Sequence, residues 1–161
     1  MKEIKLTRGH VALVDDGDYD YLNQWKWHSI KGSRTYYAVR NISIGNGKTI
    51  GLKMHRVILN ITDPDILADH KDRNGLNNQR YNLRIATKSQ NGCNRLSASG
   101  STSAFVGVHW AKYHNKWRAK IGKGGKQYHL GYFETMEEAA LAYNEAAKIL
   151  HLDFANLNKV I

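Results

Sequence analysis

The sequence predicts an α+β protein, because strand-like and helix-like patterns occupy separate stretches of the chain. Short runs of alternating apolar and polar residues, typical of half-buried strands, recur in the first 51 residues and again over 105–133. Residues 136–150 (MEEAALAYNEAAKIL) have the helical period and follow a T-x-x-E capping box. The length of 161 residues suits one ordinary domain or two small ones, and a hydrophobic content of 42% provides for a core.

The first part of the chain, residues 1–51, is expected to be β-rich. Strands are predicted in the segments GHVALVDD, QWKWHSI and RTYYAVRNISIG, and GNGK at 45–48 is a typical hairpin turn. Between the first two strands, DDGDYDYLNQ predicts a short helix with Asp15 or Asp16 as its N-cap.

The middle part, residues 52–95, is predicted to contain short helices and strands. MHRVILNI is a helix candidate that ends before Pro64, because the residue before a proline is biased away from helix. A short strand is expected to end at the DH pair, and NLRIAT is typical of a second strand. The capping box TKSQ predicts a further helix that begins at Lys88.

The last part of the chain follows a run of small polar residues at 96–103, which we interpret as a linker. Residues 104–161 are expected to hold three strands, FVGVHWAK, KWRAKIG and KQYHLGYF, with the hairpin turn GKGGK between the last two. Small apolar residues recur on one face of the final helix and favour close packing against a sheet: Ala139, Ala142, Ala146 and Leu150.

The charge of the chain indicates an anionic partner. The formal net charge is +10, and each of the three parts is positive, which suits an extended surface along a phosphate backbone. General solubility is the alternative interpretation of this charge. No apolar run is long enough for a membrane span, no apolar signal core is present, and Cys93 is the single cysteine. We therefore expect a cytoplasmic protein with no membrane partner.

Four polar residues of the middle part form a candidate site. Asp69 and Asn91 offer a carboxylate and an amide oxygen, which suit a hard divalent cation such as Mg²⁺ or Mn²⁺. His70 would stand beside the ion and take a proton from water, and Asn82 could fix the imidazole tautomer by a hydrogen bond. The alternatives are a polar surface loop with a stray histidine, or a decayed site that binds without cutting.

The ordered pattern D-H-x-D-x-N-x-x-N-N-x-x-x-N-L-R-x-x-T-x-x-x-N resembles the HNH endonucleases, in the subgroup found among phage and bacterial homing endonucleases. The resemblance implies a ββα-metal unit over 52–95, and a phage-infected or bacterial cell as the setting of the protein. It implies that His70 is the general base, that Asp69 and Asn91 bind the metal, and that Asn82 orients His70.

The sequence departs from that pattern at one position and lacks one accessory feature. Arg73 stands where glycine is usual in the D-G-N turn, so it adds a phosphate contact or strains the turn. The zinc-binding cysteine pairs of some relatives are absent. Near the site, three arginines are candidate DNA contacts: Arg56, Arg73 and Arg84.

Residues 104–158 resemble an AP2 DNA-binding domain, through FVGVHW, KWRAKI, HLGYFETMEEAALAYNEAA and the closing ANLN. The resemblance implies a three-stranded antiparallel sheet backed by one helix, with the outer face of the sheet in the DNA major groove. Trp117, Ala119 and Ile121 are expected to face the helix. The candidate DNA contacts are His109, Lys112, Lys116, Arg118, Lys120 and His129. A basic module that binds protein is the alternative.

Together these features predict a metal-dependent, site-specific endonuclease of the homing type that hydrolyses phosphodiester bonds in double-stranded DNA. The expected parts are a β-rich N-terminal part (1–51), an HNH unit (52–95), a linker (96–103) and an AP2-like domain (104–161). The rival prediction is a non-catalytic, DNA-binding transcriptional regulator. The oligomeric state stays open between a monomer and a homodimer.

Overall fold

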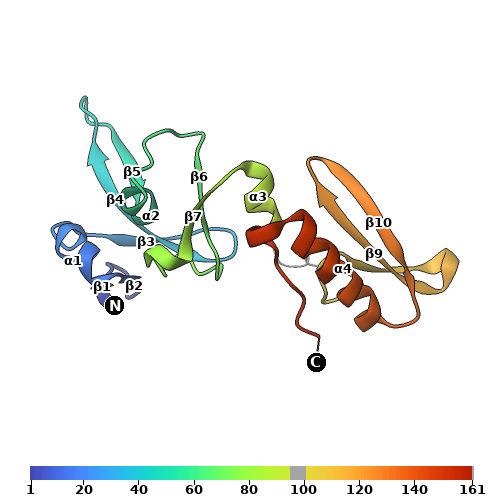
Figure 1. Cartoon of the computed structure of the whole chain (residues 1–161). Coiled ribbons are helices and arrows are strands. Elements are labelled where there is room, and N and C mark those ends of the chain that lie inside the picture. Colours follow the sequence, from blue (N-terminus) through green and yellow to red (C-terminus); the bar gives the residue numbers. More distant parts are fainter. Residues whose placement is uncertain (95–100, 161) are drawn as a thin grey trace. The chain divides into compact units, whose positions relative to one another are not determined.

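The computed structural model describes residues 1–94 and 101–160, which divide into two compact units, 1–87 and 88–161 (Figure 1). Of the predicted linker, residues 96–100 lie outside the described residues. The hydroxyl of Thr102, in contrast, accepts a hydrogen bond from the backbone N–H of Trp110 at 3.0 Å. The architecture is mixed and strand-rich, as expected for the α+β class.

The first unit starts with an antiparallel hairpin of β1 (Lys2–Lys5) and β2 (Val11–Val14), followed by helix α1 (Asp16–Leu22). The predicted N-cap, Asp15, stands before α1 in an extended conformation. β1 was not predicted, because its four residues, KEIK, contain a single apolar side chain. Strands β3 (His28–Lys31), β4 (Tyr36–Ser43) and β5 (Thr49–Lys53) form an antiparallel sheet in that order.

The rest of the first unit is a ββ hairpin entered from a short helix. Helix α2 (Met54–Ile58) leads to β6 (Leu67–His70), which pairs antiparallel with β7 (Leu83–Ala86) after the 3-10 turn η1 (Arg80–Asn82). The predicted ending of a strand at the DH pair is therefore confirmed. One hydrophobic cluster joins these elements to the N-terminal hairpin and sheet; its largest fully buried side chains are Trp27, Leu22, Met54 and Val14.

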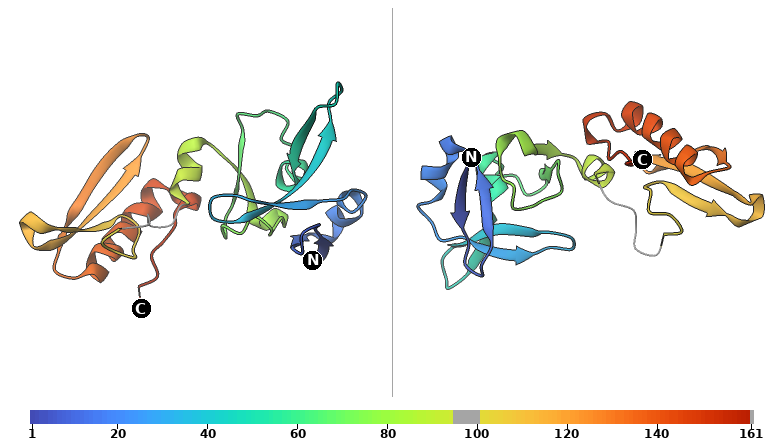
Figure 2. Two further views of the ribbon diagram at one scale, coloured as in Figure 1. Left: turned by 180° about the vertical axis from the view of Figure 1, so that it is seen from behind. Right: turned by 90° about the horizontal axis from the view of Figure 1, so that it is seen from below.

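The second unit opens with helix α3 (Lys88–Cys93), which begins at the predicted residue. Strands β8 (Val108–Ala111), β9 (Lys116–Lys123) and β10 (Lys126–Phe133) form an antiparallel sheet in the order β10-β9-β8. Short 3-10 turns η2 (Lys112–His114) and η3 (Leu152–Phe154) follow β8 and the last helix. That helix, α4 (Met136–Leu150), lies along one face of the sheet, as the views in Figure 2 show.

Helix α4 has the predicted capping box: Thr135 accepts from the N–H of Glu138, whose carboxylate accepts from the N–H of Thr135. Of its predicted apolar face, Ala139 is fully buried, but further along the helix the fully buried positions lie one residue after Ala142 and Ala146, at Tyr143 and Ala147. The buried residues are Ala139, Ala140, Tyr143, Asn144 and Ala147, whereas Ala142, Ala146 and Leu150 lie partly buried at the margin. The reason is a long-range contact, because the Tyr143 ring fills the space beside Gly107, where a Cβ atom would be 2.2 Å away.

Within the described residues, no helix is both long and apolar enough to cross a membrane.

Candidate active site

His70 is the last residue of β6 and is buried, with 5% of its surface exposed. The ring of His55, on α2, meets it edge to face at 4.9 Å between centroids, with the two planes at 87°. Tyr37, on β4, contacts both rings, at 5.7 Å from His55 and 5.9 Å from His70. Asn78 Oδ1 lies 3.4 Å from His70 Nε2. Three separate segments of the first unit therefore fix the position of this imidazole.

The electrostatic setting favours a neutral imidazole at both histidines. Burial lowers the pKa of His70, against the opposing effects of the Asn78 hydrogen bond and the charges of Asp72 and Asp69. Burial, together with His70 and nearby cations, lowers the pKa of His55 to about 3. A neutral histidine retains a lone pair on one ring nitrogen, so His70 can accept a proton at neutral pH.

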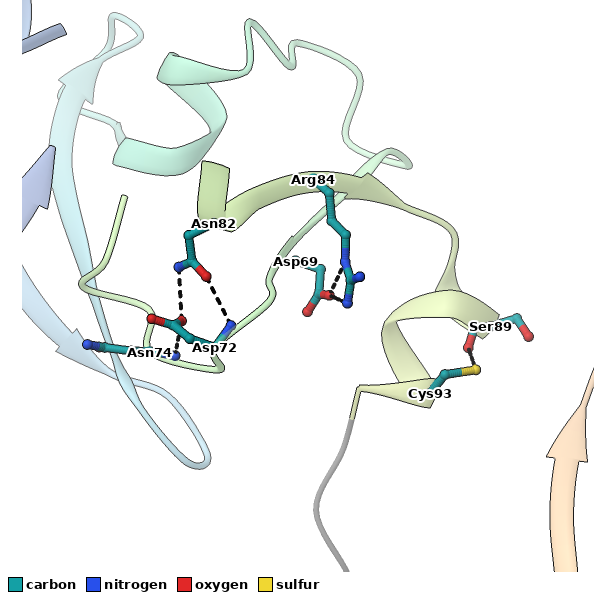
Figure 3. Close-up of polar contacts among 7 residues, drawn as sticks. All are labelled: Asp69, Asp72, Asn74, Asn82, Arg84, Ser89 and Cys93. Atoms are coloured by element: carbon teal, nitrogen blue, oxygen red, sulfur yellow. Dashed lines mark hydrogen bonds and ion pairs between the residues drawn. The ribbon is translucent and has the colours of Figure 1, made fainter. Parts of the chain in front are cut away.

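Asn82 organises the loop that follows His70 (Figure 3). Its Nδ2 donates to Asp72 Oδ1 at 2.9 Å and to the carbonyl of Asn77 at 2.8 Å, and its Oδ1 accepts from the N–H of Asp72 at 3.0 Å. The N–H of Arg73 in turn donates to the carbonyl of His70 at 2.9 Å. The hydrogen bonds given for Asn82 thus fix the backbone beside the histidine, and the predicted bond to the imidazole stays a prediction.

Arg73 adopts the left-handed conformation, with φ of 65°. Glycine adopts this conformation without steric cost, whereas other residues lose about 1–2 kcal/mol. The Asp72 carboxylate compensates in part, because Oδ1 accepts from the N–H of Asn74 at 2.8 Å and Oδ2 from Asn77 Nδ2 at 2.8 Å. The departure from the family pattern therefore introduces backbone strain into a loop that Asp72 holds together.

The N-terminal hairpin and the residue after it also form hydrogen bonds to the loop that follows His70. Backbone hydrogen bonds of 2.8 Å join the N–H of Leu13 to the carbonyl of Leu76 and the N–H of Asn78 to the carbonyl of Leu13. Asp15 Oδ2 accepts from the N–H of Arg80 at 2.8 Å, and the Arg80 guanidinium pairs with Asp18. The acidic run that predicted a helix cap thus also anchors η1.

Asp69 is paired with Arg84, its direct partner across the β6–β7 ladder. The Nε and Nη2 atoms of Arg84 both contact Asp69 Oδ2, at 2.8 and 2.6 Å (Figure 3). The two side chains are only 12% and 8% exposed, so this is a buried ion pair. The predicted metal ligand and a predicted DNA contact therefore bind one another.

The remaining predicted residues of this region lie in two places. Arg56 donates from its guanidinium to the backbone carbonyls of Asp63 and Ile66, so it holds the segment between α2 and β6. Asn91 is exposed on α3, which groups with the second unit. Its role as a metal ligand stays a prediction.

The donor chemistry of Asp69 and Asn91, a carboxylate and an amide oxygen, fits a hard divalent cation. Over residues 1–94 and 101–160, no group of three or more histidine, cysteine or acidic side chains is arranged to hold a metal. The predicted ligands, Asp69 and Asn91, are one acidic residue and one amide, so they do not form such a group. A cation at Asp69 would have to compete with the Arg84 guanidinium.

The face of the β8–β10 sheet opposite α4 is basic and aromatic. His109, Arg118 and Tyr132 lie side by side across the three strands, and Lys120 is paired with His129. Nε of Arg118 is buried and has no hydrogen-bond partner among the described residues. On the inner face, Ala119 and Ile121 are buried, and Trp117 packs at the edge of the core, as predicted.

Aromatic rings extend this outer face. The Tyr132 ring contacts two histidine rings in tilted arrangements, that of His114 at 4.0 Å and that of His129 at 4.7 Å between centroids. Burial and the charges of Lys120 and Arg118 lower the pKa of His109. Of the other predicted contacts, Lys112 is exposed in η2, and Lys116 forms an exposed ion pair with Glu134 at 2.6 Å.

Four residues near His70 were missed as site residues by sequence reasoning. Asp72 and Asn78 belong to the motif itself, and His55 belongs to the MHR segment, so each carried a signal. Tyr37 carried none, because it lies 33 positions before His70 in an aromatic strand that is typical of a sheet core.

The two units define a basic α+β protein with a buried histidine site on one unit and a basic sheet face on the other. Comparison with known proteins gives its family. An uncharacterized HNH endonuclease of Acanthamoeba polyphaga mimivirus is 32% identical over 158 residues, which cover 95% of this chain and 77% of that protein. The chain therefore belongs to the HNH endonuclease family.

Two further relatives match parts of the chain. Protein 3.8 of Escherichia phage T7 is 33% identical over 87 residues, 54% of this chain and 71% of that protein. The AP2-like ethylene-responsive transcription factor ANT of Arabidopsis thaliana is 31% identical over 130 residues, 74% of this chain but 22% of that protein. No family model and no solved structure matches the chain.

Proposed function

We propose that the protein is a metal-dependent, site-specific endonuclease of the homing type that hydrolyses phosphodiester bonds in double-stranded DNA. The observation that carries the proposal is His70: a buried imidazole at the end of β6, directly after Asp69 and fixed by three segments of the fold. Burial lowers the pKa of this imidazole, which favours its neutral form. Membership in the HNH endonuclease family supports it.

His70 acts as the general base. In the tautomer that carries its proton on Nε2, that nitrogen donates to Asn78 Oδ1, and the lone pair that takes a proton from water is on Nδ1. Asn82 and Asp72 hold the following loop, and His55 and Tyr37 prevent rotation of the ring. The resulting hydroxide attacks the phosphorus, and the bond between phosphorus and the 3′ oxygen breaks. The 3′ oxygen then takes a proton from water, which leaves 3′-hydroxyl and 5′-phosphate ends.

Asp69 and Asn91 would hold the divalent cation, Mg²⁺ or Mn²⁺. When bound, the cation stabilises charge on the phosphate and on the leaving oxygen. One such site per chain makes a nick in one strand the expected product of a monomer, and a homodimer is needed to cut both.

The second unit supplies affinity as an AP2-like DNA-binding domain. Its sheet face presents Arg118, Lys120, His109 and His129 without an acidic side chain on β8, β9 or β10, and a two- or three-stranded ribbon fits the major groove. Tethering this module to the catalytic unit raises the local concentration of the latter on DNA.

The test is cleavage of supercoiled plasmid with Mg²⁺ or Mn²⁺. We expect conversion to the nicked form, its loss in EDTA, and its loss in His70→Ala. The control is His28→Ala, which alters a histidine on β3 outside the site. Binding of the plasmid without cleavage, across many sequences, would instead support a DNA-binding regulator, the function named for the plant relative.

A further inference from the structure

We propose that Arg84 couples DNA binding to metal binding by exchanging partners: it pairs with Asp69 in the free protein and with a DNA phosphate in the complex. The inference rests on the proposed function and deepens it. Arg84 would then make metal binding depend on DNA, whereas a residue that only contacts DNA or only forms a structural ion pair would not.

The geometry makes the pair strong in the free protein. Asp69 and Arg84 face each other across the β6–β7 ladder, so the sheet register holds their backbones together. Two guanidinium nitrogens contact one carboxylate oxygen, at 2.8 and 2.6 Å. Both side chains are almost fully buried, which makes the attraction larger than at the surface, and loss of one partner strands a buried charge.

The same pair opposes a cation at Asp69. A divalent ion on that carboxylate would stand a few ångströms from the guanidinium, and like charges at that distance repel strongly in a poorly solvated site. The cation therefore binds weakly while Arg84 stays in place. Without a metal, the Arg84 guanidinium compensates the charge of Asp69. The residues around His70 therefore need no metal to remain folded.

A DNA phosphate removes this conflict. Guanidinium groups bind phosphate oxygens in the same two-pronged geometry as carboxylates. If Arg84 turns to a phosphate, Asp69 becomes the ligand of the cation, and every charge again has an opposite partner. Phosphate and cation thus favour each other, and by linkage the coupling is reciprocal. The cation would load mainly when substrate is present.

The chain offers a matched control. Arg80 also binds an aspartate, Asp18, through Nε and Nη2, at 2.8 and 2.7 Å. That side chain is 57% exposed, and Asp18 lies on α1, away from the predicted metal ligands. Arg80→Gln therefore removes the same charge and the same kind of pair, while the backbone N–H of residue 80 keeps the hydrogen bond to Asp15 that anchors η1.

The primary experiment is a Mn²⁺ titration of the full chain without DNA at pH 8, read by electron paramagnetic resonance of the free ion. We expect Arg84→Gln to bind Mn²⁺ about tenfold more tightly than the wild type, a difference of about 1.4 kcal/mol. Arg80→Gln should match the wild type. The double variant Asp69→Asn with Arg84→Gln should not bind Mn²⁺ more tightly than the wild type, because the carboxylate ligand is then absent.

Equal or weaker Mn²⁺ binding by Arg84→Gln would overturn the inference, as would a gain that persists in the double variant. If Arg84→Gln does not fold, Arg84→Lys serves in its place, because lysine keeps the charge but loses the two-pronged contact. It should bind Mn²⁺ more tightly than the wild type by a smaller factor, and unchanged binding would overturn the inference.

A second titration adds a mixed-sequence DNA duplex. The duplex should tighten Mn²⁺ binding by a larger factor in the wild type than in Arg84→Gln, since only the wild type exchanges partners. Equal factors would overturn the inference. The proposed function and the partner exchange can fail separately. Tighter Mn²⁺ binding by Arg84→Gln, without plasmid cleavage by the wild type, would contradict the nuclease activity only. Plasmid cleavage without that change in Mn²⁺ binding would contradict the partner exchange only.

Discussion

The rings of His55 and His70 meet edge to face, 4.9 Å apart, although 15 positions separate them in the sequence. Because Tyr37 contacts both rings, the proposed base is held within an aromatic cluster rather than by a single hydrogen bond. This relationship leads to the first of five tests.

Removal of the His55 ring should slow cleavage without weakening DNA binding. We expect His55→Ala to lower the single-turnover cleavage rate by about tenfold or more, because misplacement of a catalytic group is costly. His55→Phe, which keeps an aromatic ring of similar size, should retain most of the rate. A loss in the phenylalanine variant as large as in the alanine variant would show that the ring nitrogens, rather than the packing, matter.

His55 should make the fold sensitive to acid. Burial lowers its pKa in the folded state to about 3, whereas in the unfolded chain it is about 6.5. The unfolded state therefore binds the proton first, and stability is full above about pH 6.5 and falls as the pH drops toward 3. At pH 4.5 the loss from this group is about 2–3 kcal/mol.

The measurement is urea unfolding at pH 7 and pH 4.5. His55→Phe should lose clearly less stability between the two pH values than the wild type does. An equal loss in the two proteins would mean that other groups govern the acid response. His70 is a candidate for such a group, because burial lowers its pKa as well.

Replacement of Arg73 by glycine should stabilise the protein. The left-handed backbone, with φ of 65°, costs a non-glycine residue about 1 kcal/mol, and Arg73→Gly removes that strain. We expect a gain of about 1 kcal/mol in chemical denaturation. Lys71→Gly, in the same loop but without a positive φ, should give no gain. Stabilisation by both variants would contradict the explanation.

Gly75 is required where the loop after His70 crosses β4. A Cβ atom there would lie 2.4 Å from the carbonyl oxygen of Tyr36 and 2.6 Å from the Tyr37 ring. We expect Gly75→Ala to destabilise the protein by about 1–3 kcal/mol and to slow cleavage by displacing Tyr37. Thermal unfolding is the measurement of stability, and in it Gly17→Ala, on α1 with open space around it, should be neutral or stabilising.

The outer face of the β8–β10 sheet should carry salt-dependent DNA affinity. We expect Arg118→Gln combined with Lys120→Gln to weaken binding and to reduce the slope of log affinity against log salt by about 2, about 1 for each lost phosphate contact. Lys148→Gln, an exposed lysine of α4 paired with Glu145, is the control and should change neither quantity. If the double variant kept the slope of log affinity against log salt, the DNA would bind to a surface other than this face of the sheet.

Much of the local structure was predictable because its signals are local. The capping box at Thr135, the helix start at Lys88 and the alternation of Ala119 and Ile121 along β9 follow from residues within a few positions of each other. The order of Asp69, His70 and Asn82 in one motif was sufficient to locate the candidate site. Such patterns depend on periodicity and hydrogen bonding along the chain itself.

The tertiary structure decided what these residues contact. Only the register of β6 against β7 places Arg84 on Asp69, and only the packing of α2 and β4 brings His55 and Tyr37 to His70. The buried face of α4 likewise depends on Tyr143 filling the space beside Gly107. The sequence determined which residues could carry out the chemistry. Their charge compensation and orientation arise from contacts between distant segments, because burial and ion pairing depend on the surrounding fold and not on the neighbours in the chain.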